Sequence, residues 1–152
     1  MRIEQSFTIA APRERVWRAI TDPARMAPCI PGCDAIEITG SGRYRIRVAV
    51  AMGPVKATFN LDVEVTEETP PGFVASITRG EEGTRASVLT AHSELHLAAI
   101  DGGATEVRYI SEISIVGRLG RFGLGVMKKK AASLGDAFAQ SFRARVEAEA
   151  AA

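Results

Sequence analysis

The chain has 152 residues, of which 46% are hydrophobic and 24% charged, and its formal net charge is +1. This length and composition predict one soluble globular domain with a sizeable hydrophobic core. The balanced charge gives no indication of a nucleic-acid partner. The N-terminus lacks the apolar core of a signal peptide, and no segment is long and apolar enough to span a bilayer, so we expect a cytoplasmic protein.

The N-terminal segment predicts a strand and two short helices. Residues 2–9 alternate between apolar and polar side chains, which is typical of a strand with one buried face. Pro12 suits the first turn of a helix. Asp22-Pro23 ends that helix and opens a second, short one around residues 24–27. In the CIPGC segment that follows, Pro31-Gly32 suits the middle of a type II turn.

A first hairpin, which turns at Gly53-Pro54, can be placed in register from the sequence. One alignment sets apolar residues opposite each other on one face and arginines opposite acids on the other face. A shift by one residue would destroy both matches. The pairs are Met52–Val55, Val50–Ala57, Val48–Phe59, Ile46–Leu61 and Tyr44–Val63, with Arg45–Asp62 and Arg43–Glu64 on the polar face.

A second hairpin turns at Asp101-Gly102-Gly103 and follows the same logic. One further strand, over residues 73–78, is expected between the two hairpins. The apolar pairs of the second hairpin are Ile100–Ala104, Leu97–Val107, Leu95–Tyr109, Ala91–Ile113 and Leu89–Ile115, and its polar face pairs His96 with Arg108 and His92 with Glu112.

The C-terminal part predicts one long helix whose apolar face offers Val126, Leu134, Phe138 and Phe142 at helical spacing. A one-faced antiparallel sheet needs such a cover. We therefore predict an α+β fold in which a curved antiparallel sheet of about seven strands grips one long helix, with two short helices beside it. A single domain is expected over residues 1–147, and a frayed tail over 148–152.

Four glycines stand between the last strand and this helix: Gly117, Gly120, Gly123 and Gly125. Each glycine inside a helix costs about 1 kcal/mol relative to alanine, so their presence needs a reason. Glycine lets two backbones approach closely or leaves volume open. Two interpretations remain, a close-packed corner between strand and helix or a flexible gate at the mouth of a cavity.

Several short segments, spread over almost the whole chain, carry a resemblance to a known family. They are Val16-Trp17 with Asp22-Pro23, Cys29-Ile30-Pro31-Gly32-Cys33, the hairpin from Met52 to Phe59, Thr105-Glu106-Val107, and Val116-Gly117-Arg118-Leu119-Gly120 leading to Leu134, Phe138 and Phe142. On these segments the chain resembles the CoxG family of carbon monoxide dehydrogenase subunits, within the START-like helix-grip (SRPBCC) superfamily. Asn60 departs from the pattern, because many relatives have glycine after the hairpin phenylalanine.

The resemblance implies a non-catalytic accessory protein that serves a molybdenum hydroxylase of the carbon monoxide dehydrogenase type. It also implies a cavity for a hydrophobic, lipid-like ligand, and we expect no metal and no other cofactor. A quinone is a candidate ligand, because such an enzyme must pass its electrons to the respiratory chain. Two alternatives stay open: a helix-grip enzyme, cyclase-like or hydrolase-like, that acts on a hydrophobic small molecule, and an assembly chaperone without a ligand.

The predicted inner face of the sheet combines small side chains with few aromatic ones, which are 6% of the chain. Small residues under a long helix favour a cavity, although a filled interior is the alternative. The expected lining is Tyr44, Ile46, Val48, Val50, Ala57, Phe59, Leu61, Ala91, Ser93, Leu95, Tyr109, Ser111, Ile113, Phe122, Val126, Leu134 and Phe138.

Inward hydroxyl groups are informative, since a buried polar group needs a partner. Ser93 is expected opposite Ser111 and beside Tyr109, with Tyr44 at the far end of the first hairpin. These hydroxyls either bind the carbonyl or hydroxyl head group of an apolar ligand, or the two serines bond each other or the backbone across the strands.

No catalytic or metal site is expected. His92, Glu94 and His96 share one face, but their register places them on the solvated side of the sheet. Cys29 and Cys33 bracket a turn and are expected to be half-buried thiols. Neither a nucleophile with its base nor a pair of inward acids can be assembled from the predicted core positions.

A basic and apolar segment begins the C-terminal helix. It is interpreted either as a solvated charged stripe or as a gate that docks on an acidic partner or on anionic lipid at the inner face of the membrane. Transient docking on anionic lipid would make the protein peripheral to the membrane. The residues proposed for docking are Arg118, Gly120, Arg121, Gly123, Gly125, Lys128, Lys129 and Lys130.

Overall fold

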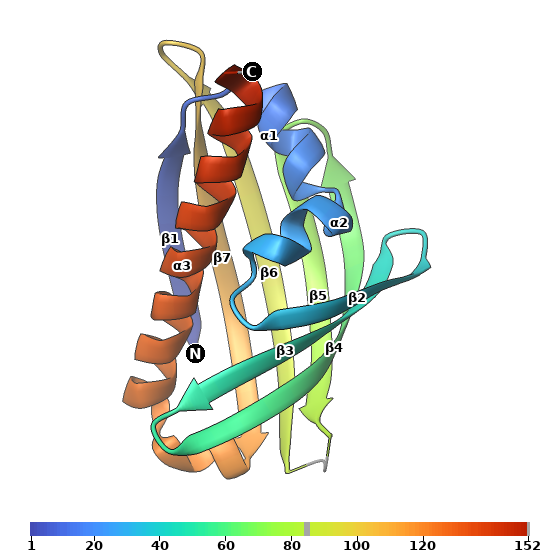
Figure 1. Ribbon diagram of the computed structural model, residues 1–152, viewed down its shortest axis with the longest axis vertical. Coiled ribbons are helices and arrows are strands. Elements are labelled where there is room, and N and C mark those ends of the chain that lie inside the picture. Colours follow the sequence, from blue (N-terminus) through green and yellow to red (C-terminus); the bar gives the residue numbers. More distant parts are fainter. Residues whose placement is uncertain (84–85, 152) are drawn as a thin grey trace.

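Seven antiparallel strands form one curved sheet in the order β1-β7-β6-β5-β4-β3-β2 (Figure 1). The computed structural model describes residues 1–83 and 86–151. In this strand order, β1 lies at one edge beside the last strand, β7, and β2 forms the opposite edge. The strands are β1 (Arg2–Ile9), β2 (Cys33–Gly40), β3 (Arg43–Met52), β4 (Val55–Thr69), β5 (Phe73–Glu82), β6 (Ser87–Ile100) and β7 (Ala104–Gly117).

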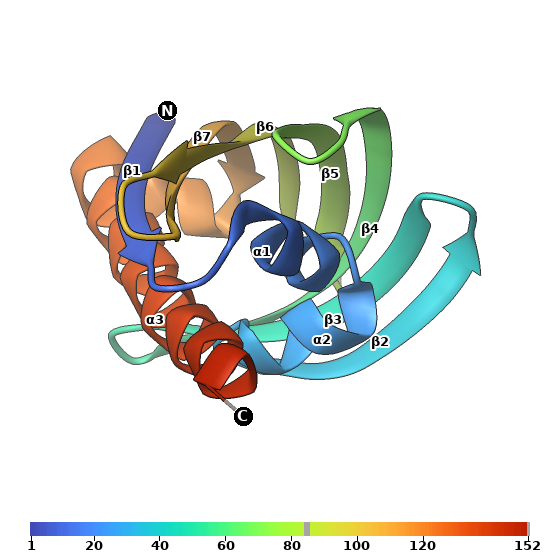
Figure 2. The ribbon, with the colours of Figure 1, turned by 90° about the horizontal axis from the view of Figure 1, so that it is seen from above.

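The helices lie on the concave side of this sheet. Viewed from above, the sheet curves around α1 and α2, while α3 runs along the side that β1 closes (Figure 2). The helices are α1 (Arg13–Ile20), α2 (Pro23–Met26) and α3 (Leu124–Ala151), with the 3-10 turns η1 (Ala27–Cys29) and η2 (Arg118–Phe122). The predicted α+β architecture, a curved antiparallel sheet with one long C-terminal helix, is confirmed.

Both hairpins have the predicted register, pair by pair. On the polar face of the first hairpin, Arg45 donates to Asp62 at 2.8 Å and Arg43 to Glu64 at 3.4 Å. The strand expected over 73–78 continues to Glu82, where it still pairs with β4. Asn60 pairs regularly with both of its neighbouring strands, and the irregularity in β4 falls between Val65 and Glu67 instead.

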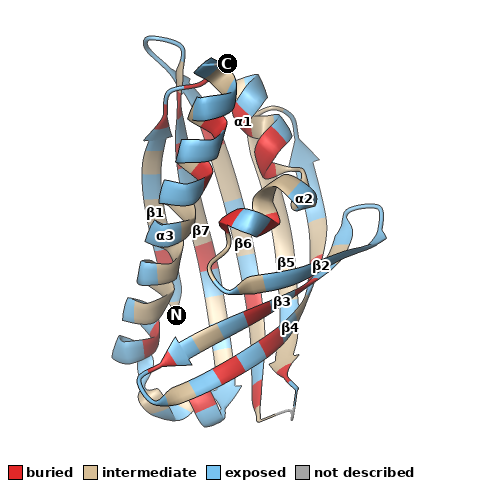
Figure 3. Ribbon diagram, in the orientation of Figure 1, coloured by how far each residue is buried: buried red, intermediate tan, exposed pale blue. Residues whose placement is uncertain are grey.

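Two hydrophobic clusters hold α3 at its two ends. Phe142 and Val146 pack with Val16 and Leu97 in one cluster, and Met127 packs in the other. Val126, expected on the apolar face, is 50% exposed, and the prediction was wrong because its neighbour Met127 takes the inward position. In Figure 3 the buried residues of α3 lie along one side of the helix.

The tail predicted to fray over 148–152 is helical through Ala151; Ala152 lies outside the described residues. Glu149 explains why this segment is helical, because its carboxylate accepts a hydrogen bond from Arg25 and its backbone carbonyl accepts one from Arg15 at 3.3 Å. These contacts tie the end of α3 to the two short helices.

The glycine-rich segment is only partly helical, since α3 begins at Leu124. Gly117 has a φ of 101°, and a Cβ there would overlap the Ala86 carbonyl, so only glycine fits. At Gly120 a Cβ would lie 3.2 Å from the Ile115 carbonyl. The corner is thus close-packed at these two positions, which favours the first of the two interpretations there. Gly123 and Gly125 have no neighbour within 4 Å of the Cβ position.

A buried carboxylate holds this corner in place. Glu82 is 4% exposed and accepts hydrogen bonds from the Arg118 guanidinium and the Ser87 hydroxyl. The Ser87 oxygen in turn accepts from the Leu119 backbone N–H at 3.0 Å, and Arg118 also donates to the Lys56 carbonyl at 3.2 Å. Arg118, and to a smaller extent Ser87, lower the pKa of Glu82 below its ordinary value. Arg118 therefore anchors the corner and is not free for docking.

We expect Glu82→Gln to lower the free energy of unfolding at neutral pH by about 1 to 2 kcal/mol, because it removes charge-assisted hydrogen bonds. A carboxylate with a lowered pKa stabilises the fold above its ordinary value of 4.5 and loses this contribution as pH falls through the lowered value. The difference between the two proteins should therefore shrink below pH 4.5. Urea unfolding at several pH values measures it, and a constant difference would contradict the role of the charge.

Candidate functional site

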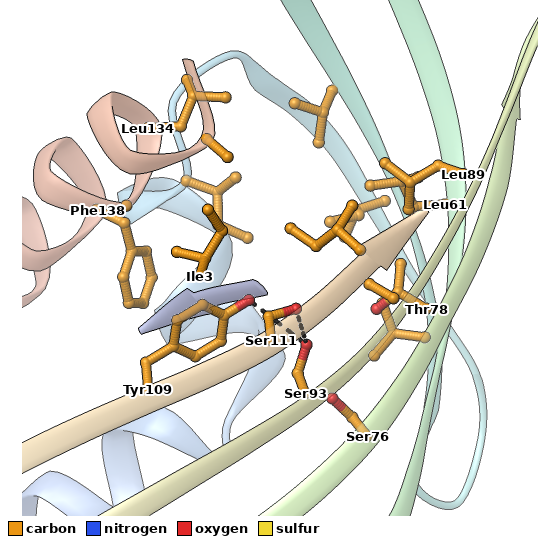
Figure 4. Close-up of a pocket in the computed structure, with 18 of the residues that line it drawn as sticks. Ile3, Leu61, Ser76, Thr78, Leu89, Ser93, Tyr109, Ser111, Leu134 and Phe138 are labelled. Atoms are coloured by element: carbon orange, nitrogen blue, oxygen red, sulfur yellow. Dashed lines mark hydrogen bonds between the residues drawn. The ribbon is translucent and has the colours of Figure 1, made fainter. Parts of the chain in front are cut away.

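A pocket of about 420 Å³ lies between the concave side of the sheet and α3 (Figure 4). Its walls come from distant parts of the chain, including Ile3 of β1, Leu61 of β4, Leu89 of β6, and Leu134 and Phe138 of α3. Most lining side chains are apolar. A pocket of this size and character is of the kind that binds small hydrophobic molecules.

All of the predicted lining residues line this pocket except Ala57, Phe122 and Val126. Ala57 and Phe122 belong to the cluster of Met52, Phe59 and Leu119 that closes one end of the fold. Those that do line the pocket are Tyr44, Ile46, Val48, Val50, Phe59, Leu61, Ala91, Ser93, Leu95, Tyr109, Ser111, Ile113, Leu134 and Phe138.

Sequence reasoning missed several lining residues, and two groups of them are instructive. Alternation along β1 places Gln5 and Phe7 on the same face as Ile3, and the segment from Ile20 to Pro31 covers the pocket from the side of the short helices. The first group had a signal, because the period of two was already recognised in β1. The second had none, since the position of a short helix depends on what it packs against.

Three serines of the pocket lie in one row across the sheet. Ser76 of β5 lies opposite Ser93 of β6, which lies opposite Ser111 of β7. Thr78 and Tyr109 lie beside this row (Figure 4). The floor of the pocket therefore carries a band of hydroxyl groups between apolar walls.

Three of these hydroxyls form a hydrogen-bonded chain that has one more proton than it has links. Ser93 Oγ lies 2.9 Å from Ser111 Oγ and 3.4 Å from the Tyr109 hydroxyl. Three O–H groups supply three protons for these two links. Ser111 is 0% exposed, and the described residues give its hydroxyl no partner other than Ser93, so a proton left there would be buried and unpaired. The favoured order is Ser111 to Ser93 to Tyr109, which leaves the Tyr109 O–H free to donate into the pocket.

Tyr44 contributes a second phenol, from β3. Burial, reinforced by the nearby Tyr109, raises the pKa of Tyr44 to about 12. Tyr44 is therefore neutral at physiological pH and can donate a hydrogen bond, but it is no base or nucleophile there. Its hydroxyl has no hydrogen-bond partner among the described residues.

Charged side chains are confined to the rim of the pocket. Glu68 and Glu94 are among the lining residues, but both are exposed, and the Glu94 side chain lies on the opposite face of the sheet, where it bonds His96; Lys130 is half-buried. The sequence predicted no acid toward the cavity, and Glu68 at the rim corrects that expectation. The interior itself offers hydroxyl groups and hydrocarbon.

The remaining polar candidates lie away from the pocket. His96 bonds Glu94 at 3.2 Å and His92 is exposed, while residues 1–83 and 86–151 contain no group of three side chains able to hold a metal. Cys29 is buried, Cys33 is half-buried, and both are free thiols whose pKa is raised by burial. These placements agree with the solvated histidines and half-buried thiols expected from the sequence, except that Cys29 is more deeply buried.

The docking residues proposed at the start of α3 fall into two sets. Arg121, Lys128 and Lys129 are exposed, whereas Lys130 turns toward the pocket. Among them lie exposed apolar side chains, with Leu124 66% exposed. None of the helices within the described ranges has the length and hydropathy required to cross a bilayer.

The fold and its pocket define a START-like helix-grip protein. Solved structures with the same fold include a conserved protein from Geobacillus kaustophilus (TM-score 0.89, 23% identity, 96% of this chain and 95% of that one). They also include a START superfamily protein from Mycobacterium smegmatis (0.74, 12%, 96% and 97%) and the Zhui aromatase/cyclase from a Streptomyces species (0.70, 17%, 97% and 93%). The chain belongs to the CoxG family of carbon monoxide dehydrogenase subunits, whose model matches residues 6–147. No curated protein sequence matches it.

One polar contact seats α3 on the wall of the pocket. The Gln5 side-chain amide donates to the Ala132 carbonyl and to Asp136, both at 3.0 Å. A Cβ at Gly135 would overlap the Gln5 amide, so the glycine within the helix makes room for this contact. The cost of about 1 kcal/mol for glycine in a helix is offset by hydrogen bonds of similar size.

We expect Gly135→Ala to be neutral or destabilising in the native chain but to stabilise a Gln5→Ala variant by about 1 kcal/mol, where only helix propensity remains. Gly125→Ala is the matched control, because no neighbour approaches that position, and its effect should not depend on Gln5. Thermal or urea unfolding of the double-mutant cycle measures the coupling. Equal effects of Gly135→Ala in both backgrounds would contradict the proposed contact.

Proposed function

We propose that this protein is a non-catalytic carrier that holds a hydrophobic ligand in the pocket and serves a molybdenum hydroxylase of the carbon monoxide dehydrogenase type. The observation that carries the proposal is the apolar pocket under α3, with its charged groups only at the rim. Membership in the CoxG family supports the association with such an enzyme.

The band of hydroxyl groups supports a ligand with a hydrogen-bond acceptor in its head group. A free Tyr109 O–H matches a carbonyl oxygen, and the neutral Tyr44 is a second donor. A quinone combines carbonyl oxygens with an apolar ring and chain. It also accepts the electrons that a molybdenum hydroxylase releases, so we take a quinone as the specific candidate.

The start of α3 supports a transient contact with an anionic membrane, from which a ligand of this kind would be taken. Between Ile113 and Gly135 the sequence has no acidic residue, and three of its basic residues, Arg121, Lys128 and Lys129, are exposed. Exposed Leu124 and Val126 lie beside Lys128 and Lys129, and the inward side of the same helix turn lines the pocket. Basic residues near an anionic surface each contribute about 1 kcal/mol, and apolar side chains insert between head groups.

A second candidate function is an enzyme that acts on a hydrophobic small molecule, because the aromatase/cyclase shares the fold. It ranks below the carrier, since the interior of the pocket holds neutral hydroxyls and the carboxylate of Glu68 lies exposed at the rim. A ligand-free chaperone is the third alternative, and an occupied pocket would contradict it.

We expect mass spectrometry of an organic extract of the purified protein to reveal a hydrophobic compound that carries a carbonyl group. Tyr109→Phe should weaken the binding of a naphthoquinone roughly tenfold, the effect of one lost hydrogen bond, and should leave the binding of naphthalene unchanged. Equal losses for both compounds would indicate a packing defect. An empty extract and no binding of either compound would contradict the carrier proposal.

We expect the protein to sediment with vesicles that contain anionic lipid and much less with neutral vesicles. Lys128→Glu should weaken this binding by at least roughly tenfold, because about 1 kcal/mol of attraction is replaced by repulsion. Arg18→Glu on α1, at the opposite end of the molecule, is the control with the same charge change (Figure 1). Equal loss in both variants would point to net charge alone and would contradict a docking surface at α3.

A further inference from the structure

We propose that the bound ligand extends out of the pocket at β2 and that its apolar chain lies across Ile36 and Ile38. This inference rests on the proposed carrier function and concerns the length of the ligand. The two isoleucines are the specificity-determining residues, because they extend the pocket wall past the point where the helices cover it.

The sheet register places both side chains on the face of the pocket. Ile36 lies opposite Ile46, and Ile38 lies opposite Tyr44. Ile46 and Tyr44 both line the pocket. Directly opposite residues of an antiparallel pair point to the same face with their side chains in contact range. The apolar wall therefore continues without interruption from β3 onto β2.

Both isoleucines are nevertheless exposed, Ile36 by 36% and Ile38 by 60%. β2 is an edge strand, and together with the start of β3 it projects past the short helices (Figures 1 and 3). Its opposite face carries Glu37, which lies opposite Arg45. An edge strand with solvent on both faces is expected to be polar on both, so the apolar side of β2 indicates an occupant.

The position of the hydroxyl band agrees with an exit at this edge. Tyr44 lies in one row with Val63 and Thr78, and this row is next to the row of Ser76 and Ser93. A head group bound at the hydroxyls of β6 and β7 directs its chain across the pocket to β3 and then to β2. The 420 Å³ of the pocket suits a ligand of drug size, and a longer chain has to continue outside.

The chain of the ligand is a better occupant than a second protein. Stable protein interfaces bury roughly 1,200–2,000 Å² in total, far more than two isoleucine side chains offer. The apolar surface is also continuous with the pocket and does not form a separate patch. A single hydrocarbon chain matches it in width and in polarity.

Affinities for benzoquinones with alkyl chains of increasing length test the inference, measured by calorimetry on the full chain. Complete burial of one methylene raises affinity roughly fourfold. In the native protein, each methylene added beyond the length that fills the pocket should contribute half of that free energy and raise affinity by about twofold. In the double variant Ile36→Thr, Ile38→Thr the gain should stop at that length. Threonine keeps the β-branched shape, so the strand remains. Val116→Thr, exposed on the opposite face of the sheet, is the control and should behave like the native chain.

The outcomes separate this inference from the function on which it rests. A plateau at the same chain length in the native protein and in the double variant overturns the exit at β2, while short-chain binding still supports the carrier. Failure of every compound to bind overturns both. If the double variant instead converts a dimer to a monomer in sedimentation, β2 is an interface between copies of the chain, and the inference is also wrong.

Discussion

The seating of α3 is the constraint on which the rest of the structure depends. The helix is held along β1, where Gln5 bonds its backbone, and at its two ends by separate hydrophobic clusters. Between these attachments it crosses a sheet that curves away from it. Interiors normally fill such space with side chains, but the strands below carry Ala91, Ser93 and Ser111, which are too short to do so. The pocket follows from these two facts together.

The pocket offers hydrogen-bond donors within apolar walls. Its interior donors are hydroxyl groups, and burial raises the pKa of one of them, Tyr44, to about 12. Such groups orient a ligand through hydrogen bonds without transferring its protons. Charged residues instead stabilise the fold, as Glu82 and Arg118 do at the corner before α3. The same fold supports an aromatase/cyclase in another protein, so the difference between binding and catalysis lies in which side chains face the cavity.

Most of the fold could be predicted because the hairpins encode their own register. Val48 opposite Phe59 and Arg45 opposite Asp62 satisfy one alignment only, and the same holds for Leu97 opposite Val107. The inward side chains of those strands followed from the register. Which helix residues face the sheet was harder to predict, because Val126 and Met127 are adjacent in sequence and both apolar, and only one of them can face the sheet. The glycines likewise divided into close-packed and open positions, which composition cannot distinguish.

The sequence by itself determined the pairing within the two hairpins and the polarity of their faces, because these depend on residues joined by short turns. The tertiary structure alone decided where α3 and the short helices lie, and therefore which residues enclose the pocket and which remain uncovered. Gln5 meets Gly135, and Glu82 meets Arg118, across separations that no periodicity records. Such contacts arise when the chain closes on itself, and their geometry is set by packing against elements that the local pattern does not contain.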